Sequence, residues 1–161
     1  MDYLWTPWRA TYMKAKRDHA GCVFCAAAES ASDSESLVVY RGQRAFVLLN
    51  RYPYTSGHLM IAPYAHVARL GQVDESTTDE MMRLARSSEK ILEQVYKPEG
   101  LNLGMNLGEA AGAGIEQHIH MHVLPRWRGD ANFMTSVANT RIIPEALEDT
   151  YVKLKSSFAG L

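Results

Sequence analysis

The chain has 161 residues, of which 47% are hydrophobic and 22% are charged, and its 17 basic and 18 acidic side chains leave a formal net charge of −1. This size and composition predict one soluble globular domain with a hydrophobic core. The charge balance argues against a nucleic-acid polymer or an anionic membrane as a partner, because a chain with this net charge exerts no long-range electrostatic attraction on a polyanion. Since no apolar run has the length of a membrane span and the N-terminus lacks the pattern of a secretory signal, we expect a cytoplasmic protein.

Residues 1–36 are expected to form an N-terminal arm that ends in an acidic, serine-rich loop. The arm begins with an aromatic and basic cluster, Trp5-Thr-Pro-Trp8-Arg9. The two cysteines follow as Cys22-Val-Phe-Cys25, a spacing that in a reducing compartment indicates metal or redox chemistry before a structural disulfide. Residues 29–36 contain only serines, acids and one alanine, which predicts a solvated loop.

The remaining chain predicts strands on either side of one long helix. Apolar residues recur near helical spacing over Thr77–Tyr96, with acids in the first turn, and Pro98 and Gly100 end this helix. A last helix is expected over about residues 144–158. β-like runs are expected at residues 37–40, 45–49, 58–62, 100–107 and 118–124. This order predicts an α+β fold with an antiparallel five-stranded sheet, in place of a regular parallel βαβ array.

Half of the six histidines lie within the segment His118-Ile-His120-Met-His122. In a β-strand these three side chains would share one face, while the apolar residues between them enter the core. The outer two would lie about 13 Å apart, too far to bind one metal ion together, so the three must have different roles. Imidazole can act as a nucleophile, an acid or base, a metal ligand or a phosphate donor. A polar, solvent-facing strand or an adventitious metal patch is the alternative.

A glycine-rich loop precedes the histidines, with the sequence Asn106-Leu-Gly108-Glu-Ala-Ala-Gly112-Ala-Gly114. Such small residues would let backbone N–H groups approach phosphate oxygens. The spacing matches neither the P-loop nor the dinucleotide-binding glycine motif, because a strand and not a helix follows. A tight β-turn without a ligand is the alternative.

Together these residues resemble the histidine triad (HIT) family. His118-Ile-His120-Met-His122-Val-Leu matches its signature His-φ-His-φ-His-φ-φ, in which φ is apolar. The resemblance covers about residues 37–127, which would form the core of the single domain between the arm and a C-terminal extension at 128–161. Companion segments of the family are matched in order by Leu49–Pro53, Gly57–Pro63 and Asn106–Gly114. Flanking segments resemble the bacterial branch that phosphorolyses diadenosine tetraphosphate, at Trp5–Arg9, Leu49–Tyr54 and Pro125–Phe133.

This resemblance implies nucleotidyl transfer through a covalent intermediate on histidine. His120 would attack the α-phosphorus of a nucleotide substrate, and inorganic phosphate or water would then accept the nucleotidyl group. His122 would donate to the α-phosphate oxygens as charge develops. The resemblance also implies a homodimer, in which the long helix and the edge strand before the glycine loop meet their symmetry mates.

The resemblance further implies a set of substrate-binding residues. Asn50 is similar to the ribose-contacting position of the family, although strand-end turn chemistry is the alternative for it and for Asn106. The phosphorylase branch often has a hydroxyl residue where this chain has Ala113-Gly114, which leaves only backbone N–H groups for an incoming phosphate. The phosphate-facing wall would consist of Asn106, Gly112, Ala113 and Gly114.

In metal-binding relatives the ligands are a Cys-x-x-Cys pair, a later histidine and the first triad histidine. The matching residues are Cys22, Cys25, His66 and His118, which would complete a closed tetrahedral zinc site. Such a zinc is expected to be structural, pinning the N-terminal segment to the sheet. His19 is the rival fourth ligand, and a redox dithiol or two unliganded thiols are the alternatives. No organic cofactor is expected.

Several residues near the histidine segment and the other expected substrate-binding residues could also contact a substrate. Arg51, Arg126 and Arg128 could meet polyphosphate oxygens, or they could be ordinary surface arginines. Trp127 and Phe133 could stack on adenine, with core or interface packing as the alternative.

The leading hypothesis is an enzyme that splits diadenosine tetraphosphate into ADP and ATP. A dinucleoside polyphosphate hydrolase and a purine nucleoside phosphoramidase are alternatives that use the same nucleophile. A nucleotide-binding sensor without turnover is a further alternative, and the three intact histidines favour the enzyme.

Overall fold

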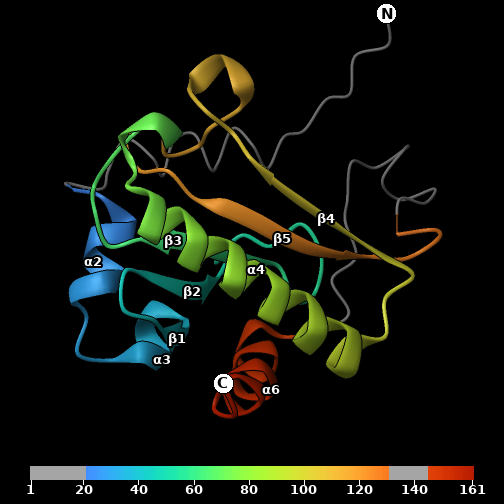
Figure 1. Cartoon of the computed structure of the whole chain (residues 1–161). Helices are drawn as coiled ribbons and strands as arrows, with labels where there is room; N and C mark the ends of the chain where they lie inside the picture. The colour runs from blue at the N-terminus through green and yellow to red at the C-terminus, as the bar shows by residue number, and fades with distance from the viewer. Residues whose placement is uncertain (1–20, 131–144) are drawn as a thin grey trace, which may run out of the picture.

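The computed structural model describes residues 21–130 and 145–161, and an antiparallel sheet forms the centre of the described fold (Figure 1). The five strands have the spatial order β1-β2-β3-β5-β4, and every neighbouring pair is antiparallel. The predicted α+β fold with a five-stranded antiparallel sheet is confirmed. The strands are β1 (Val38–Arg41), β2 (Ala45–Leu49), β3 (Leu59–Pro63), β4 (Gly100–Met105) and β5 (Met121–Arg126).

The long helix expected after the first three strands is α4 (Glu75–Tyr96), which crosses one face of the sheet (Figure 1). It begins two residues before the predicted start because the Asp74 carboxylate accepts the Thr77 N–H at 2.9 Å and caps the helix. It ends at Tyr96, because the next residue, Lys97, has a left-handed backbone and precedes Pro98. The other helices are α2 (Val23–Glu29), α3 (Asp33–Ser36), α6 (Leu147–Phe158) and the 3-10 turns η1 (Leu70–Gln72) and η2 (Glu109–Ala111).

Side-chain alternation along the strands divides the core into two layers, one on each face of the sheet. On one face, β3 contributes Leu59 and Ile61 to a cluster that packs under α4 and α6. On the opposite face, Met60 of the same strand joins Phe24 of α2 in a smaller cluster. Burying one such side chain fully stabilises the fold by about 1.5 to 3 kcal/mol, so both faces of the sheet must stay covered.

Two local predictions were wrong. The segment 118–124 does not form strand from its first residue, since β5 begins at Met121. The chain before it bonds instead to the loop after β3, where the Ile119 N–H donates to the Val67 carbonyl at 2.7 Å. The acidic, serine-rich segment is not wholly a loop, because residues 33–36 form α3, which the Ser32 hydroxyl caps by accepting the Glu35 N–H.

Some predicted features lie outside the described residues. They are the aromatic and basic cluster near the N-terminus, His19, Phe133 and the expected start of the last helix at Pro144. Within the described ranges, no helix is both long enough and apolar enough to cross a membrane.

Candidate active site and metal centre

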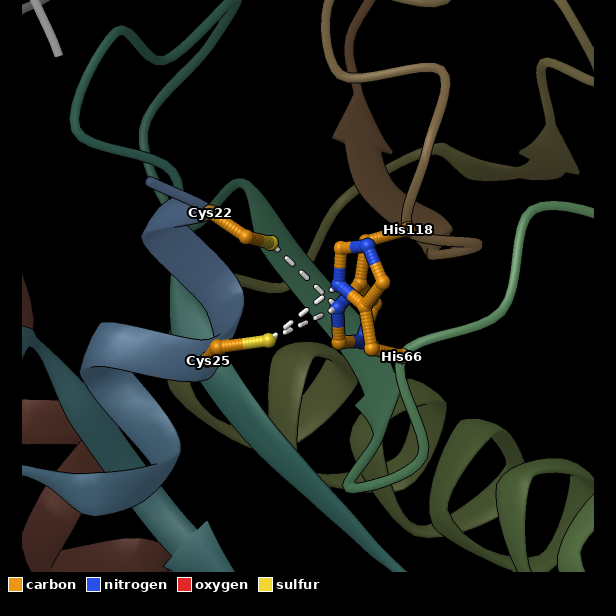
Figure 2. A group of neighbouring side chains, drawn as sticks. All are labelled: Cys22, Cys25, His66 and His118. Atoms are coloured by element: carbon orange, nitrogen blue, oxygen red, sulfur yellow. Dashed lines mark hydrogen bonds between the residues drawn. The ribbon is translucent and has the colours of Figure 1, made fainter. Parts of the chain in front are cut away.

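Two cysteines and two histidines from distant parts of the chain meet beside α2 (Figure 2). Cys22 directly precedes α2, Cys25 lies in its first turn, His66 follows β3, and His118 precedes β5. Their four ligand atoms lie within 4.8 Å of one another. The structure therefore brings together the four residues predicted as metal ligands.

The distances in this cluster fit a tetrahedral zinc ion. With bonds of roughly 2.3 Å to sulfur and 2.1 Å to nitrogen, tetrahedral angles place S and N ligand atoms about 3.6 Å apart. The Cys22 and Cys25 Sγ atoms lie 3.4 and 3.7 Å from His118 Nδ1, and Cys25 Sγ lies 3.2 Å from His66 Nδ1. Burial and a hydrogen bond with Cys22 raise the pKa of the Cys25 thiol, and a bound divalent cation would favour its thiolate form.

The buried side chain of His118 is oriented toward this cluster by the backbone. Its Nε2 lies 2.9 Å from the Pro63 carbonyl oxygen, which can only accept a hydrogen bond. The Nε2 atom therefore carries the proton, and the Nδ1 lone pair faces the cysteines. A backbone acceptor of this kind commonly fixes the tautomer of a metal-binding histidine.

His120 has the opposite tautomer. Its Nδ1 lies 2.9 Å from the backbone carbonyl oxygen of His118, so Nδ1 carries the proton and Nε2 keeps a free lone pair. The side chain is only 6% exposed, and burial lowers the pKa of His120 below its ordinary value. The imidazole is therefore neutral near pH 7 and can act as a nucleophile through Nε2.

His122 points from β5 to the sheet face that carries α2, opposite Met60 and Gly104 in the neighbouring strands. Its Nδ1 lies 2.9 Å from Nε2 of the fully buried His58. The Tyr54 N–H donates to His58 Nδ1 at 3.2 Å, which places the His58 proton on Nε2 and makes His58 the donor to His122. His122 therefore carries its own proton on Nε2, where it can donate to an anion. Burial, with repulsion from His120, lowers the pKa of His122 to about 4.

His58 is a residue of this cluster that sequence reasoning missed, because it was placed in a β-like run and a family companion segment without a role of its own. Its partner His122 is 64 positions away, and the two meet because β3 and β5 are adjacent in the sheet. The sequence did contain a signal, since a polar histidine at the start of an apolar run needs a hydrogen-bond partner when it is buried. The partner could not be identified without the order of the strands.

The hydrogen-bonded pair of His58 and His122 is called the histidine relay below. The predicted substrate residues lie around this relay and along the glycine loop. Asn50 caps the turn before His58, since its Oδ1 accepts the Tyr52 N–H at 2.9 Å and its Nδ2 lies 3.4 Å from His58 Nδ1. Asn106 donates from Nδ2 to the Gly112 carbonyl at 3.5 Å.

The glycine loop closes on itself through backbone hydrogen bonds. The Gly112 N–H donates to the Glu109 carbonyl at 2.9 Å, and the Ala113 N–H donates to the Gly108 carbonyl at 3.2 Å. Gly108 and Gly112 have φ angles of 95° and 88°, which L side chains rarely adopt. In the predicted wall at Gly112–Gly114, the N–H groups of Gly112 and Ala113 are thus bonded within the loop. The Gly114 N–H has no backbone acceptor among the described residues.

Two of the candidate arginines are held by protein partners outside the histidine cluster. Arg51 donates to the Glu35 carbonyl at 2.7 Å, and Arg126 forms an ion pair with Asp130 at 2.5 Å. Trp127 packs edge-on against Tyr96 of α4, with ring centres 6.4 Å apart. For Arg128, the described contact is made by its backbone, whose N–H donates to the Glu99 carboxylate at 2.5 Å.

The chain is similar in sequence to a known domain family and to proteins of known name. The sequence pattern of the HIT domain matches residues 31–129. A Mycobacterium tuberculosis protein named AP-4-A phosphorylase is 39% identical over 166 aligned positions, which cover 99% of this chain and 85% of that protein. A Schizosaccharomyces pombe protein named bis(5'-nucleosyl)-tetraphosphatase (asymmetrical) is 28% identical over 59% of this chain and 52% of its own length.

The fold agrees with solved structures as well. A zinc-bound histidine triad family protein from Mycobacterium smegmatis superposes with a TM-score of 0.68 and 26% identity, covering 87% of this chain and 94% of that one. A hypothetical histidine triad nucleotide-binding protein from Sulfolobus tokodaii superposes with the same TM-score and identity, over 87% and 93% of the two chains. The matched domain, the long alignment and the arrangement of the three histidines agree, and the chain belongs to the histidine triad family.

Proposed function

We propose that this chain is a histidine triad enzyme that transfers a nucleotidyl group from a dinucleoside polyphosphate. The substrate that we infer is diadenosine tetraphosphate, and the acceptor that we infer is inorganic phosphate, so that the products are ATP and ADP. The observation that carries the proposal is the bond between His120 Nδ1 and the His118 carbonyl, which leaves the nucleophilic nitrogen of His120 free. The name of the M. tuberculosis relative supports this substrate and reaction.

In the first step, His120 Nε2 attacks the α-phosphorus, and the P–N bond forms as the bond to the bridging oxygen of the ATP leaving group breaks. The Nε2 proton of His122 stabilises the charge that develops on the phosphate oxygens and on the leaving oxygen. His58 keeps that proton on Nε2 by occupying Nδ1 of His122. In the second step, a phosphate oxygen attacks the same phosphorus, the P–N bond breaks, and His120 returns as the neutral imidazole with ADP released.

Zinc is the metal that we propose for the Cys22, Cys25, His66 and His118 cluster. When bound, it supplies a closed tetrahedral crosslink with no open position for chemistry. His118 would serve this site through Nδ1 while its carbonyl holds His120, so one residue joins the metal centre to the nucleophile. The zinc-bound relative from M. smegmatis supports this choice of metal.

A hydrolase that uses water as acceptor is the second candidate, and a specific feature favours it. Ala113-Gly114 stands where a hydroxyl residue is expected in a phosphorylase, and the Ala113 N–H is already bonded within the loop. The S. pombe relative, named as a tetraphosphatase, is consistent with such an outcome.

A second copy of this chain is the protein partner that we propose. β4 is an edge strand and carries Leu103, which is 47% exposed, and α4 carries Met82, which is 53% exposed. Apolar side chains on these two elements would be covered if both met their symmetry mates. A mass near 36 kDa, measured by light scattering after gel filtration, is the expected result, since the chain mass is 18.0 kDa.

Product analysis tests the proposed reaction. Purified protein is incubated with diadenosine tetraphosphate, with and without inorganic phosphate, beside the His120→Ala variant. ADP and ATP that form only with phosphate support the phosphorylase, and AMP and ATP that form in both conditions support the hydrolase. If the wild-type protein turns over neither way, phosphoramidates are tested next, and a nucleotide-binding sensor is the remaining function.

A further inference from the structure

Phe24, one of the two residues between Cys22 and Cys25, contacts the proposed nucleophile His120. Phe24 lies in α2 and is fully buried, with 0% of its surface exposed. Its ring centre is 4.5 Å from that of His120, with the planes tilted by 35°, and 5.1 Å from that of His118. Contact at this distance limits how far the His120 ring can rotate, because the interior around it is closely packed.

The position of Phe24 depends on how α2 is held, since a seven-residue helix has little stability by itself. At its N-terminal end, Cys22 and Cys25 belong to the metal cluster. At its C-terminal end, the Arg41 guanidinium donates to the carbonyls of Ala27 at 2.9 Å and Ala28 at 2.7 Å. Those carbonyls have no partner within the helix, and Arg41 satisfies them.

Arg41 is itself fixed by a chain of ion pairs. Its Nε lies 2.8 Å from Asp33 Oδ1, and Asp33 Oδ2 lies 2.7 Å from Lys155 Nζ of α6. The helix that carries Phe24 is therefore held at one end by the metal ligands and at the other by Arg41. Phe24 lies between these two anchors, on the side that faces His120.

We infer that Phe24 is a positioning residue that holds the His120 ring in its reactive orientation, from a helix whose ends are held by the cysteine pair and by Arg41. The inference rests on the proposed function of His120 as the nucleophile. It adds a second connection between the two sites, beside the direct one through the His118 carbonyl. Phe24 touches His120 from the α2 side, whereas the carbonyl holds it through Nδ1.

Phe24→Leu tests this inference, with Phe46→Leu as the matched control. Phe46 is also fully buried in the same cluster, but its ring stacks on Tyr64 at 5.2 Å. Both variants are prepared with saturating zinc, and their bound zinc and Tm are measured. Misplacing a reacting group by about 1 Å can reduce a rate by about a hundredfold, so kcat of Phe24→Leu should fall by about ten- to a hundredfold with KM nearly unchanged.

The imidazole ¹⁵N shifts of His120 provide a readout that needs no substrate. The wild-type ring should show one tautomer with the proton on Nδ1, and Phe24→Leu should show a mixture of tautomers. Phe46→Leu should keep the single tautomer and the wild-type kcat. Phe24→Met serves as a second variant, with the same expected results, if Phe24→Leu does not fold.

Three results would overturn the inference. They are an unchanged kcat and tautomer in the Phe24 variants, an equal loss of kcat in the Phe46 control, or a loss that occurs only together with loss of zinc. An inactive wild-type protein would instead contradict the proposed function, and the tautomer measurement would still test the contact between Phe24 and His120.

Discussion

His118 and His120 are joined by a 2.9 Å hydrogen bond from the His120 Nδ1–H to the backbone carbonyl of His118. Because the His118 side chain belongs to the metal cluster, one residue serves both sites. A movement of the His118 backbone on loss of the metal would move the acceptor that fixes the His120 tautomer. His118 therefore links the cysteine–histidine cluster to His120, through its side chain on one side and its carbonyl on the other.

Removing the nucleophile should separate binding from turnover. His120→Ala is expected to lower kcat by at least about a thousandfold, because the variant lacks the nitrogen that forms the P–N bond in the proposed mechanism. The affinity for a nucleotide, measured by calorimetry with AMP, should change little. A pure binding protein would show the reverse, with altered affinity and no turnover to lose.

His58 should matter for catalysis although it is fully buried. His58→Ala removes the donor to His122 Nδ1 and frees His122 to adopt either tautomer, so kcat should fall by about 10² to 10⁴-fold, as when the group that orients a catalytic histidine is lost. His58→Gln keeps an amide donor near the same place and should recover part of the loss. Equal activities of the two variants, measured by steady-state kinetics, would contradict the relay.

Acidification should destabilise the protein through His122. Its pKa is lowered to about 4, whereas a histidine in the unfolded chain has a pKa of about 6.5. Between these values the unfolded state binds more protons, so the free energy of unfolding is highest above pH 6.5 and falls as the pH drops toward 4. The loss between pH 7 and pH 5 should be about 2 kcal/mol.

Urea denaturation of the wild-type protein and of His122→Gln at both pH values checks this prediction. The variant lacks the titrating group and should lose less stability on acidification than the wild type. The same loss in both proteins would show that other groups cause the pH dependence.

Loss of one thiolate ligand should release the metal and lower the thermal stability. Cys25→Ser is expected to contain less than a tenth of an equivalent of zinc, against about one equivalent in the wild type. Its Tm should fall by about 10 °C, since each kcal/mol corresponds to roughly 2 to 4 °C in a chain of this size. Val23→Ala is the control, because Val23 lies in the same helix, is 41% exposed and provides no ligand.

The metal content of the wild type decides between the alternatives for the two cysteines. It is measured by elemental analysis of protein purified without chelators. A wild-type protein with less than a tenth of an equivalent would contradict the zinc site.

The open strand face beside His122 should be where the nucleotide binds. Gly104 lies opposite His122 in β4, and a Cβ added there would meet no atom within 4 Å. Gly104→Val should therefore fold normally, yet it should weaken nucleotide binding at least about tenfold because its side chain occupies the face that the substrate needs. Gly100→Val is the control, since Gly100 lies opposite Arg126 and is equally open. Equal affinities of the two variants, measured by calorimetry, would place the substrate elsewhere.

The sequence by itself was enough to predict the α+β architecture, since periodicity is a local property. The helical spacing of apolar residues identified α4 to within two residues, and β-like runs predicted the approximate positions of all five strands. The spacing of Cys22 and Cys25 and the run of three histidines are also local patterns, and the structure brings Cys22, Cys25, His66 and His118 together as the family resemblance implied. A short cap at Ser32 and the late start of β5 escaped prediction, since both depend on individual hydrogen bonds.

Only the tertiary structure decided which partner each histidine has and which of its nitrogens carries the proton. The tautomers of His118 and His120 follow from backbone carbonyls, one of them in a strand 55 residues away. The pairing of His58 with His122 follows from the adjacency of β3 and β5, which no short-range pattern specifies. The contact of Phe24 with His120 likewise depends on how α2 docks against the sheet. Local spacing determines which residues can form a site, whereas long-range packing and fixed backbone acceptors determine where the protons lie and which nitrogen can react.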